Sequence, residues 1–453
     1  MQARTLPERQ CREIAGGVSA LLQRTGPFER RNPRLFVLFT MLYNARAYYP
    51  VLAVLFTDLG LRLDQFVLLN GVWAAAIFLF EVPSGALADT IGRKRLLVFS
   101  AALMVLEMGV LLFAPKDGGW LLFSLCLLNR FLSGTSEAAA SGADEAIAYE
   151  ALPEENRESA WDQVMGTAMR WRSAGFLVAM TAGGLLYDPS WWNRMVPENF
   201  RLSVEFAHRL PVALVFLQAL ACLWIALRFE ETMPRRDHAV DRCQSALRLT
   251  LQTALKAFGT RSIALVLLGG LLIDAVARNF ATLNSEYYRL IGVPAWAFGF
   301  IGSLIAVGNW FIPSIASRVN QRFSPTASLA LGGAVACAGL FLLVPGWPWA
   351  GLVPAMLLMM LLGFVSFTVS RFLHGVAESE QRATLLSVKG LVFNLGYGAY
   401  SLGFSLMLAG LGKQGGGVFQ RALLWQAGFF AVALLGFVVI SGFKGRGRTE
   451  DDL

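Results

Sequence analysis

The chain has 453 residues and a mean hydropathy of +0.53, with 55% hydrophobic and only 15% charged residues. A soluble domain carries about 25% charged residues, so this composition excludes an ordinary soluble protein and predicts many membrane-spanning segments. The net charge of +8 does not indicate a nucleic-acid partner, because the basic residues gather between the apolar runs, where membrane topology explains them.

Metal, nucleotide and cofactor sites are not expected. The cysteines and histidines are scattered, and their spacing is not typical of a metal site. No glycine-rich phosphate loop is present, so ATP hydrolysis is not expected either. The residues concerned are Cys11, Cys126, Cys222, Cys243, Cys337, His208, His238 and His374.

Apolar runs long enough to cross a bilayer follow one another along the chain. We therefore expect an all-α membrane protein with twelve transmembrane helices. The first 33 residues lack the compact apolar region of a signal peptide, so the N-terminus is expected to stay inside. The predicted spans are 35–57, 66–88, 96–115, 120–149, 162–187, 210–228, 262–290, 295–317, 327–346, 350–373, 387–410 and 420–442.

Basic residues lie almost entirely on one side of these spans if the spans alternate in direction. They are concentrated before the first span, at Arg93–Arg95, between the sixth and seventh spans, and after the last span. This asymmetry predicts that both termini are cytoplasmic.

The longest link between spans divides the chain into two bundles of six helices. Part of this link, Gln244–Phe258, has apolar residues among polar ones; an amphipathic helix on the membrane surface and an ordinary tether both remain open. The predicted regions are an N-terminal tail (1–34), a first bundle (35–228), the linker (229–261), a second bundle (262–442) and a C-terminal tail (443–453).

Polar residues inside the spans are candidate functional residues, because a charge in the hydrocarbon region costs at least roughly 2.5–3.5 kcal/mol on insertion scales. In the fourth span, Arg130, Ser133, Glu137, Ser141 and Asp144 recur every three or four residues and form one helical stripe. An adjacent stripe of small residues, Gly134, Ala138 and Gly142, suits close helix packing. We expect the polar stripe to line a water-filled cavity; the alternative is that Arg130 and Glu137 pair and only stabilise the bundle.

The first and seventh spans carry arginines in the same register, since a glycine follows Arg46 and Arg278 by the same number of residues, at Gly60 and Gly292. Two arginines at mid-membrane favour an anionic or zwitterionic substrate. The alternative is that carboxylates neutralise them. The expected polar residues beside them are Asn44, Asp274 and Asn279, with Asp274 able to pair with Arg278 at i,i+4 and Glu137 with Arg46.

The other charged residues within the spans are weaker candidates for a functional role. Glu107 has no evident partner in the sequence, so we expect it to be protonated or packed. Arg170, Arg172 and Lys389 lie near the ends of their spans, where long side chains can reach the interface.

The turn after the second span carries a recognisable motif, Gly85-Ala-Leu-Ala-Asp89-Thr-Ile-Gly92-Arg93-Lys94-Arg95. It resembles motif A of the major facilitator superfamily, and Arg130-x-x-x-Gly134 resembles that family's motif B, which is associated with proton coupling. The glycines of the fifth span resemble motif C of antiporters, although Ala179-Met180 replaces its Gly-Pro. Glu81-Val-Pro-Ser-Gly85 is similar to a bacterial branch of drug-efflux-like permeases.

The resemblance implies a monomeric secondary transporter of the bacterial cytoplasmic membrane that works by rocker-switch alternating access. Its expected partners are a small-molecule substrate, protons and the lipid bilayer. Proton-coupled efflux of amphipathic compounds is the first expectation, and proton-coupled uptake of an organic anion or of a metal-chelate or siderophore-like solute is the alternative. A non-transporting membrane sensor and a lipid-modifying enzyme are distant alternatives.

For motif A, the resemblance implies a mechanical role. Asp89 is expected to face the N-terminus of the eleventh span, where helix N–H groups favour a carboxylate. Arg93 is expected to reach Glu150, or else Asp144. Gly85 and Gly92 are expected to permit close approach and a tight turn. These contacts would hold the outward-open state and break when the bundles rock.

The motif A hypothesis predicts that Asp89→Asn inserts normally but transports more slowly, because the amide loses the charge that a helix N-terminus attracts. Uptake or efflux rates normalised to the amount of membrane-inserted protein would measure this. Wild-type transport by a correctly inserted Asp89→Asn protein would remove the predicted role.

Overall fold

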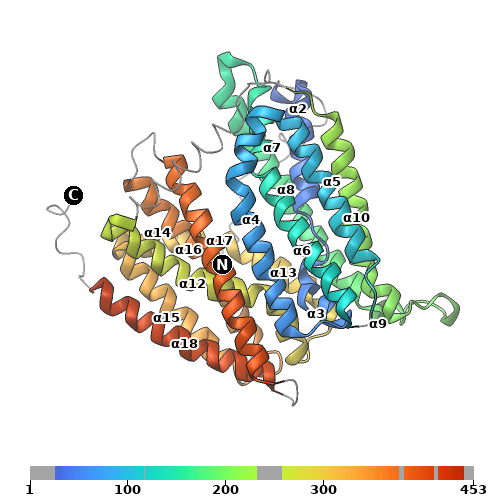
Figure 1. The fold of residues 1–453 in the computed structure, drawn as a ribbon, viewed down its shortest axis with the longest axis vertical. Coiled ribbons are helices and arrows are strands. Elements are labelled where there is room, and N and C mark those ends of the chain that lie inside the picture. The colour runs from blue at the N-terminus through green and yellow to red at the C-terminus, as the bar shows by residue number, and fades with distance from the viewer. Residues whose placement is uncertain (1–25, 117, 232–257, 377–381, 413–416, 443–453) are drawn as a thin grey trace, which may run out of the picture.

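The computed structural model is all-helical, and its described residues are 26–116, 118–231, 258–376, 382–412 and 417–442 (Figure 1). The helices form two bundles. The first bundle contains α2 (Arg31–Asn44), α3 (Leu52–Asp58), α4 (Leu63–Ile91), α5 (Arg93–Leu112), α6 (Trp120–Ala140), α7 (Ala143–Glu150), α8 (Arg157–Tyr187), α9 (Pro189–Trp192) and α10 (Val204–Arg228). The second contains α12 (Arg261–Leu290), α13 (Ala295–Asn309), α14 (Ile312–Arg322), α15 (Pro325–Leu343), α16 (Leu352–Val376), α17 (Arg382–Gly410) and α18 (Val418–Ser441).

Each of the twelve predicted runs is helical, but not all of them are single, apolar helices. Within the described residues, eight helices are long and apolar enough to cross a membrane, and the bent pair α13–α14 would make a ninth. The remaining three runs fall short because the first is broken into short helices, while α6 of the fourth and α8 of the fifth carry polar and charged residues. The structure thus supports a multi-pass membrane protein with eight or nine candidate spans.

The helix breaks have local causes. The first predicted span stops being helical at Ala45, and the chain resumes through the short 3-10 helix η2 (Tyr49–Val51). Pro50 has no N–H to donate to the carbonyl of Arg46, four residues earlier, and its ring would clash with that carbonyl in a continuous helix. The fourth span breaks at Ser141–Gly142, where Gly142 has a φ of +75°, a conformation that glycine adopts without strain. The predictions of continuous helices over 35–57 and 120–149 were therefore wrong.

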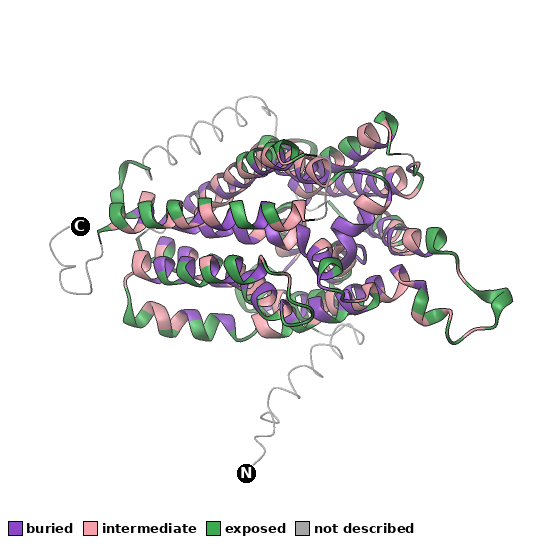
Figure 2. Ribbon diagram, turned by 90° about the horizontal axis from the view of Figure 1, so that it is seen from below, coloured by how far each residue is buried: buried purple, intermediate pink, exposed green. Residues whose placement is uncertain are grey.

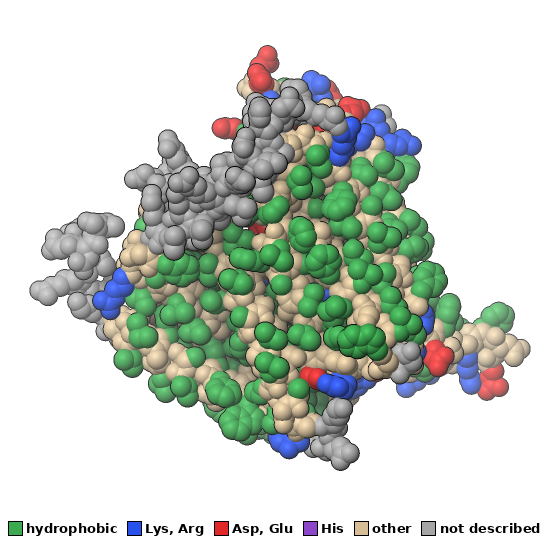
Figure 3. All heavy atoms as spheres, in the orientation of Figure 1, with side chains coloured by type: hydrophobic (Ala, Val, Ile, Leu, Met, Phe, Trp, Pro, Cys, Tyr) green, Lys and Arg blue, Asp and Glu red, His purple; other side chains and the backbone are tan. Residues whose placement is uncertain are grey.

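The surface of the molecule fits a lipid environment. Buried residues face one another between the helices, while the outward faces are exposed (Figure 2), and many of the exposed residues are large hydrophobic ones. In the space-filling view, hydrophobic side chains cover the middle of the molecule and charged side chains gather toward its two ends (Figure 3). A membrane-spanning protein needs this distribution, because lipid tails contact its flanks and water its ends.

The two bundles meet at one end of the molecule and diverge toward the other (Figure 1). We call the first end the Asp58 end, after the last residue of α3, and the second the Gly92 end, after the α4–α5 turn. Helix α4 packs on α17, and α8 packs on α13. The hydrogen bonds and ion pairs found between the bundles within the described residues lie in the half of the molecule toward the Asp58 end, or at the α8–α13 contact.

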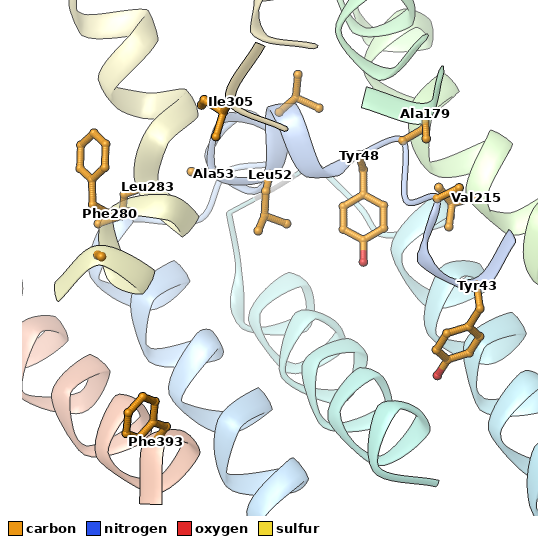
Figure 4. Close-up of a cluster of buried hydrophobic side chains, with 14 of the residues drawn as sticks. Tyr43, Tyr48, Leu52, Ala53, Ala179, Val215, Phe280, Leu283, Ile305 and Phe393 are labelled. Atoms are coloured by element: carbon orange, nitrogen blue, oxygen red, sulfur yellow. The ribbon is translucent and has the colours of Figure 1, made fainter. Parts of the chain in front are cut away.

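The α2–α3 segment lies between the two bundles. In the close-up, Tyr48, Leu52 and Ala53 from this segment lie between Phe280 of α12 and Ala179 of α8 (Figure 4). The N–H groups of Ala53 and Val54, in the first turn of α3, donate to Ser285 Oγ of α12 at 3.0 and 3.2 Å. First-turn N–H groups have no partner within their own helix, so the break in the first span creates donors that the opposite bundle satisfies.

The small-residue stripe predicted in the fourth span produces close packing of α6 against α4. A Cβ atom added at Gly134 would lie 2.5 Å from the carbonyl oxygen of Trp73 and 2.8 Å from Ala76 Cβ. Beside it, Ser84 Oγ donates to the carbonyl oxygen of Ala138 at 2.7 Å. The prediction of close packing is confirmed at Gly134 and Ala138, whereas Gly142 serves as a helix break.

This packing predicts that Gly134→Leu destabilises the protein, because the side chain would collide with α4 backbone that cannot move aside. Small residues at such contacts let helix backbones approach. Gly436→Leu in α18 is the matched control, since nothing lies within 4 Å of an added Cβ there. Thermal unfolding in detergent should show a lower Tm for Gly134→Leu alone; equal Tm values for the two variants would contradict the packing argument.

Candidate functional site

A polar cavity of about 470 Å³ lies beside the break in the first span. Helices α2, α4, α6, α7 and α8 of the first bundle supply its walls. The lining residues are Tyr43, Asn44, Arg46, Tyr49, Trp73, Glu137, Ala140, Ser141, Gly142, Asp144, Glu145 and Arg172. Three carboxylates, two arginines and three aromatic rings therefore share one wall.

Arg46 is held by a carboxylate behind this wall. Its Nη1 lies 2.9 Å from Glu107 Oε1 and 3.2 Å from Glu107 Oε2, and Tyr48 adds its hydroxyl at 3.2 Å. Arg46 is 2% exposed and Glu107 is fully buried. Asn129 anchors the same turn of α5 by donating to the Glu107 carbonyl oxygen at 2.8 Å. A buried charge needs such a partner, because an unpaired one is strongly destabilising.

Glu137 lines the cavity, and none of the described arginines forms an ion pair with it. The indole of Trp73 lines the same cavity. Arg130, two turns earlier on α6, is buried and is not a lining residue. Its guanidinium stacks 4.8 Å from the ring centre of Phe56, and its Nε and Nη2 make no hydrogen bond within the described residues.

A second, more apolar cavity of about 410 Å³ adjoins the first. The two cavities share Asn44, Tyr49 and Arg172, so they lie next to each other. The second is lined on one side by α8, including Phe176 and Leu177, and on the other by Ala306 and Val307 of α13 and by Trp310 at the α13–α14 bend. A polar cavity in the first bundle thus lies beside an apolar cavity between the bundles.

The second bundle has its own cluster of charges. Arg278 lies 2.8 Å from Asp274 Oδ2 and donates from Nη1 to Asn394 Oδ1 at 2.9 Å. Its guanidinium also lies 5.2 Å from the ring centre of Tyr397. Lys389 of α17 donates to Ser370 Oγ at 2.9 Å. None of these residues lines the two cavities described above.

The α4–α5 turn is tied to two acidic residues. Arg93 forms an ion pair with Glu150 at the end of α7. The Glu231 carboxylate accepts from the backbone N–H groups of Arg93 and Lys94, both at 3.2 Å. Gly92 has a φ of +98°, and a side chain there would collide with Glu231. The first turn of α5 is therefore capped by a residue that lies shortly after the end of α10.

Comparison with known proteins decides the family. The family model described as Major Facilitator Superfamily matches residues 34–400. The chain belongs to the major facilitator superfamily. It is accordingly a membrane-embedded secondary transporter of a small solute and not an enzyme.

Solved structures agree with this fold. A nucleoside transporter, NupG, superposes with a TM-score of 0.67 at 14% identity, covering 91% of this chain and 99% of its own. A D-xylose-proton symporter gives 0.63 at 14% identity, covering 92% and 99%. A bacterial homolog of the human lysosomal transporter Spinster, in an inward-facing and unoccupied conformation, gives 0.63 at 16% identity, covering 95% and 97%. A search of curated proteins gives no significant match.

Several predicted contacts are present in the transporter. Arg93 contacts Glu150, Arg278 contacts Asp274, and Glu137 lines a cavity together with Ser141 and Asp144. Asn44 also lines it, whereas Asn279 is fully buried and its amide group has no hydrogen-bond partner within the described residues.

Other predictions were wrong. Arg46 pairs with Glu107 and not with Glu137, so Glu107 does have a partner. Arg172 lines the cavity instead of merely reaching the interface. The described residues show no pair between Arg130 and Glu137, and Arg130 is not part of the cavity wall.

The motif A turn also differs from expectation. Nothing lies within 4 Å of a Cβ added at Gly85, so close approach is required only at Gly92. The Arg93–Glu150 pair lies within one bundle and is formed in a structure whose bundles are apart at this end. The side chain of Asp89 lies outside the described residues, as do the two tails and most of the linker that includes Gln244–Phe258.

Sequence reasoning missed Trp73, Glu145 and Trp310 as cavity residues. Trp73 lies in a span rich in apolar residues and carries no charge to mark it. Trp310 can be recognised as a cavity residue only once the bend of 43° between α13 and α14 is known. A signal did exist for the position of Arg46, because Pro50 indicates that the first span is interrupted close to this arginine.

The buried ion pair predicts that Glu107→Gln lowers stability by about 3–5 kcal/mol, since it leaves Arg46 as an uncompensated buried charge. Thermal unfolding of the purified transporter would show this as a reduced Tm. The double variant Arg46→Met/Glu107→Gln should recover much of the loss, because the charge is gone. A Glu107→Gln protein as stable as wild type would show that the pair carries no such energy.

Proposed function

We propose that this transporter exports an amphipathic cation across the bacterial cytoplasmic membrane in exchange for protons. The observation that supports the cation is the charge balance of the cavity. Its wall carries Glu137, Asp144 and Glu145 against Arg46 and Arg172, and Arg46 is already paired with Glu107 behind the wall. Negative charge is therefore in excess where a solute would bind.

The aromatic and apolar walls support the amphipathic character of the solute. Tyr43, Tyr49 and Trp73 line the same space as Glu137, and a cation over an aromatic face is stabilised by about 0.5–2 kcal/mol. The adjoining cavity offers Phe176, Leu177 and Trp310 to an apolar body. A solute with a positive group at Glu137 and an apolar group toward α13 would fill both parts.

Proton coupling is supported by the position of Glu137. A carboxylate that has no arginine bound and faces the cavity can hold either a cationic solute or a proton, but not both. Exchange of the two at one carboxylate would couple their opposite movements. Resemblance to motif B at Arg130 and Gly134 points to the same coupling, as does the sequence similarity to drug-efflux-like permeases.

The membrane potential supports export as the direction. An interior-negative potential draws a cation inward by about 2.3 kcal/mol per charge per 100 mV, so uptake of a monovalent cation needs no proton coupling. Export of the cation against this potential does need proton coupling. The cytoplasmic location of both termini, the twelve-span topology and the monomeric state remain part of the same proposal.

Uptake of an organic anion, or of a chelate-like anion, is the second candidate. It rests on Arg46 and Arg278 as free positive charges in the cavity. Both arginines are paired with carboxylates, Glu107 and Asp274, and Arg278 does not line either cavity described here. The observed pairs therefore favour the cation.

A matched pair of probes tests the sign of the charge. Tetraphenylphosphonium and tetraphenylborate have nearly the same shape and opposite charge. We expect the purified wild-type protein to bind the cation more tightly, and Glu137→Gln to weaken cation binding about tenfold, which corresponds to about 1.4 kcal/mol. Calorimetry or thermal shift would measure both affinities.

Glu198→Gln, an exposed carboxylate outside the cavity, is the control and should leave both affinities unchanged. Tighter binding of tetraphenylborate would favour the anion candidate instead. Proton release on binding of the cation to the wild type, and its loss in Glu137→Gln, would test the exchange at this carboxylate.

A further inference from the structure

A narrow arm projects from the first bundle at the Asp58 end. It comprises residues 193–202, between α9 and α10, and we call it the lateral arm. Figures 1 and 2 show it extending sideways, away from the bundle, instead of continuing along the direction of α10. Helices α8 and α10 pack on each other, so the connection between them does not need such an excursion.

Hydrogen bonds at its root give the lateral arm a defined shape. The Asn193 side chain donates to the carbonyl oxygen of Leu202 at 3.0 Å and accepts the Leu202 N–H at 2.9 Å, which closes the arm as a hairpin. Just before it, Asp188 accepts the N–H of Ser190 at 2.9 Å and caps α9. Asp188 also accepts the backbone N–H of Trp296 in α13 at 3.2 Å. The root is thus fixed against both bundles, and the arm can hold its direction.

The lateral arm exposes large apolar side chains. Met195 is 72% exposed and Phe200 is 74% exposed. Val204 and Phe206 continue the exposed apolar surface into the first turn of α10. Apolar side chains gathered on a protruding surface indicate that another phase or molecule covers them.

The position of the lateral arm identifies the lipid bilayer as the surface that covers it. The connection that carries it runs from Tyr187, the last residue of α8, to Val204, the first residue of α10. At the same level, Arg209 in the second turn of α10 donates to carbonyl oxygens at the end of α5. Three helices of the bundle therefore end or begin here. An arm that starts at this level and runs sideways lies over the lipid beside the bundle, in the headgroup layer of roughly 5–8 Å.

The polar and aromatic residues of this region fit the same layer. Two arginines, Arg194 and Arg201, and one carboxylate, Glu198, leave the lateral arm with a net charge of +1. Glu198 pairs with Arg201 at 3.0 Å, and the long side chain of Arg194 can reach lipid phosphate. At the root, the rings of Trp191 and Trp192 lie 4.5 Å apart, and tryptophan is enriched at membrane–water interfaces.

We propose that the lateral arm is a membrane-binding element. Met195 and Phe200 insert among the phospholipid headgroups of the leaflet at the Asp58 end, and Arg194 binds their phosphates. In the topology proposed above, this is the periplasmic leaflet. The arm enlarges the contact of the first bundle with the leaflet and fixes the depth of the α8–α10 connection. Lipid binding of this kind goes beyond the transport function and does not depend on which solute is carried.

Spin labelling in lipid nanodiscs tests the position of the lateral arm. Phe200→Cys carries the label in a background without native cysteines, and Glu154→Cys is the aqueous reference, since the Glu154 side chain is 90% exposed. Relaxation is measured with nickel chelated to lipid headgroups and, separately, with a water-soluble nickel chelate. We expect the ratio of headgroup to soluble nickel contact to be about tenfold higher at position 200 than at position 154, equivalent to about 1.4 kcal/mol.

A change at Met195 tests whether insertion depends on the apolar tip. In the protein labelled at position 200, Met195→Glu should lower the nickel ratio to about that of the Glu154 reference, because a carboxylate loses the apolar contact and is repelled by lipid phosphates. Met195→Leu is the matched control and should keep the high ratio. Both variants should unfold at the wild-type Tm in detergent, since Met195 is largely exposed.

Three outcomes would overturn the proposal. Free access of soluble nickel to position 200 would place the tip in water. Shielding of this label from both forms of nickel would place the tip against protein. Dipolar coupling between labels at position 200 on two molecules would identify a second copy of the chain as the partner in place of lipid.

Discussion

The buried pair between Arg46 and Glu107 is the interaction on which the first bundle depends. Arg46 lies where the first span leaves helical geometry, and local bonds satisfy this backbone: the Arg46 N–H donates to the Asn44 carbonyl at 3.0 Å, and the Tyr49 N–H donates to the Arg46 carbonyl at 3.1 Å. A broken helix in a membrane is tolerated only where its polar groups find partners in the protein. The charge of Arg46 needs one as well, and Glu107 supplies it.

The same break determines how helix α3 contacts the second bundle. Because α3 starts afresh, its first-turn N–H groups are free to bind Ser285 of the opposite bundle. Its last residue is Asp58, a negative charge at the end of a helix that disfavours one. Arg289 compensates this charge from the opposite bundle. A seven-residue helix therefore contacts the other bundle at both of its ends.

Local patterns in the sequence predict part of this arrangement. Apolar run lengths locate the long helices, and i,i+4 spacing finds the Asp274–Arg278 pair. Pairs between residues far apart in the chain were harder to predict. Glu107 is 61 residues from Arg46, and the residue pattern of its span does not indicate which helix Glu107 faces. Charge alone therefore left open whether the two arginines are free or neutralised by carboxylates, whereas the packing of the first bundle pairs Arg46 with Glu107. Helix breaks were missed because hydropathy averages over them, and Gly142 and Pro50 mark them only locally.

The cavity and the Asp58–Arg289 ion pair between the bundles are connected through one continuous segment, residues 45–58. Its beginning carries Arg46 and Tyr49 in the cavity wall, its middle binds Ser285, and its end carries Asp58. A solute that contacts Tyr49 therefore contacts the same short segment whose last residue, Asp58, pairs with Arg289 of the opposite bundle. Since Tyr49 also lines the apolar cavity next to α13, such a solute touches both bundles at once. Binding energy can bias the relative position of the bundles only through contacts that differ between the two states, and this segment makes contacts of that kind with both.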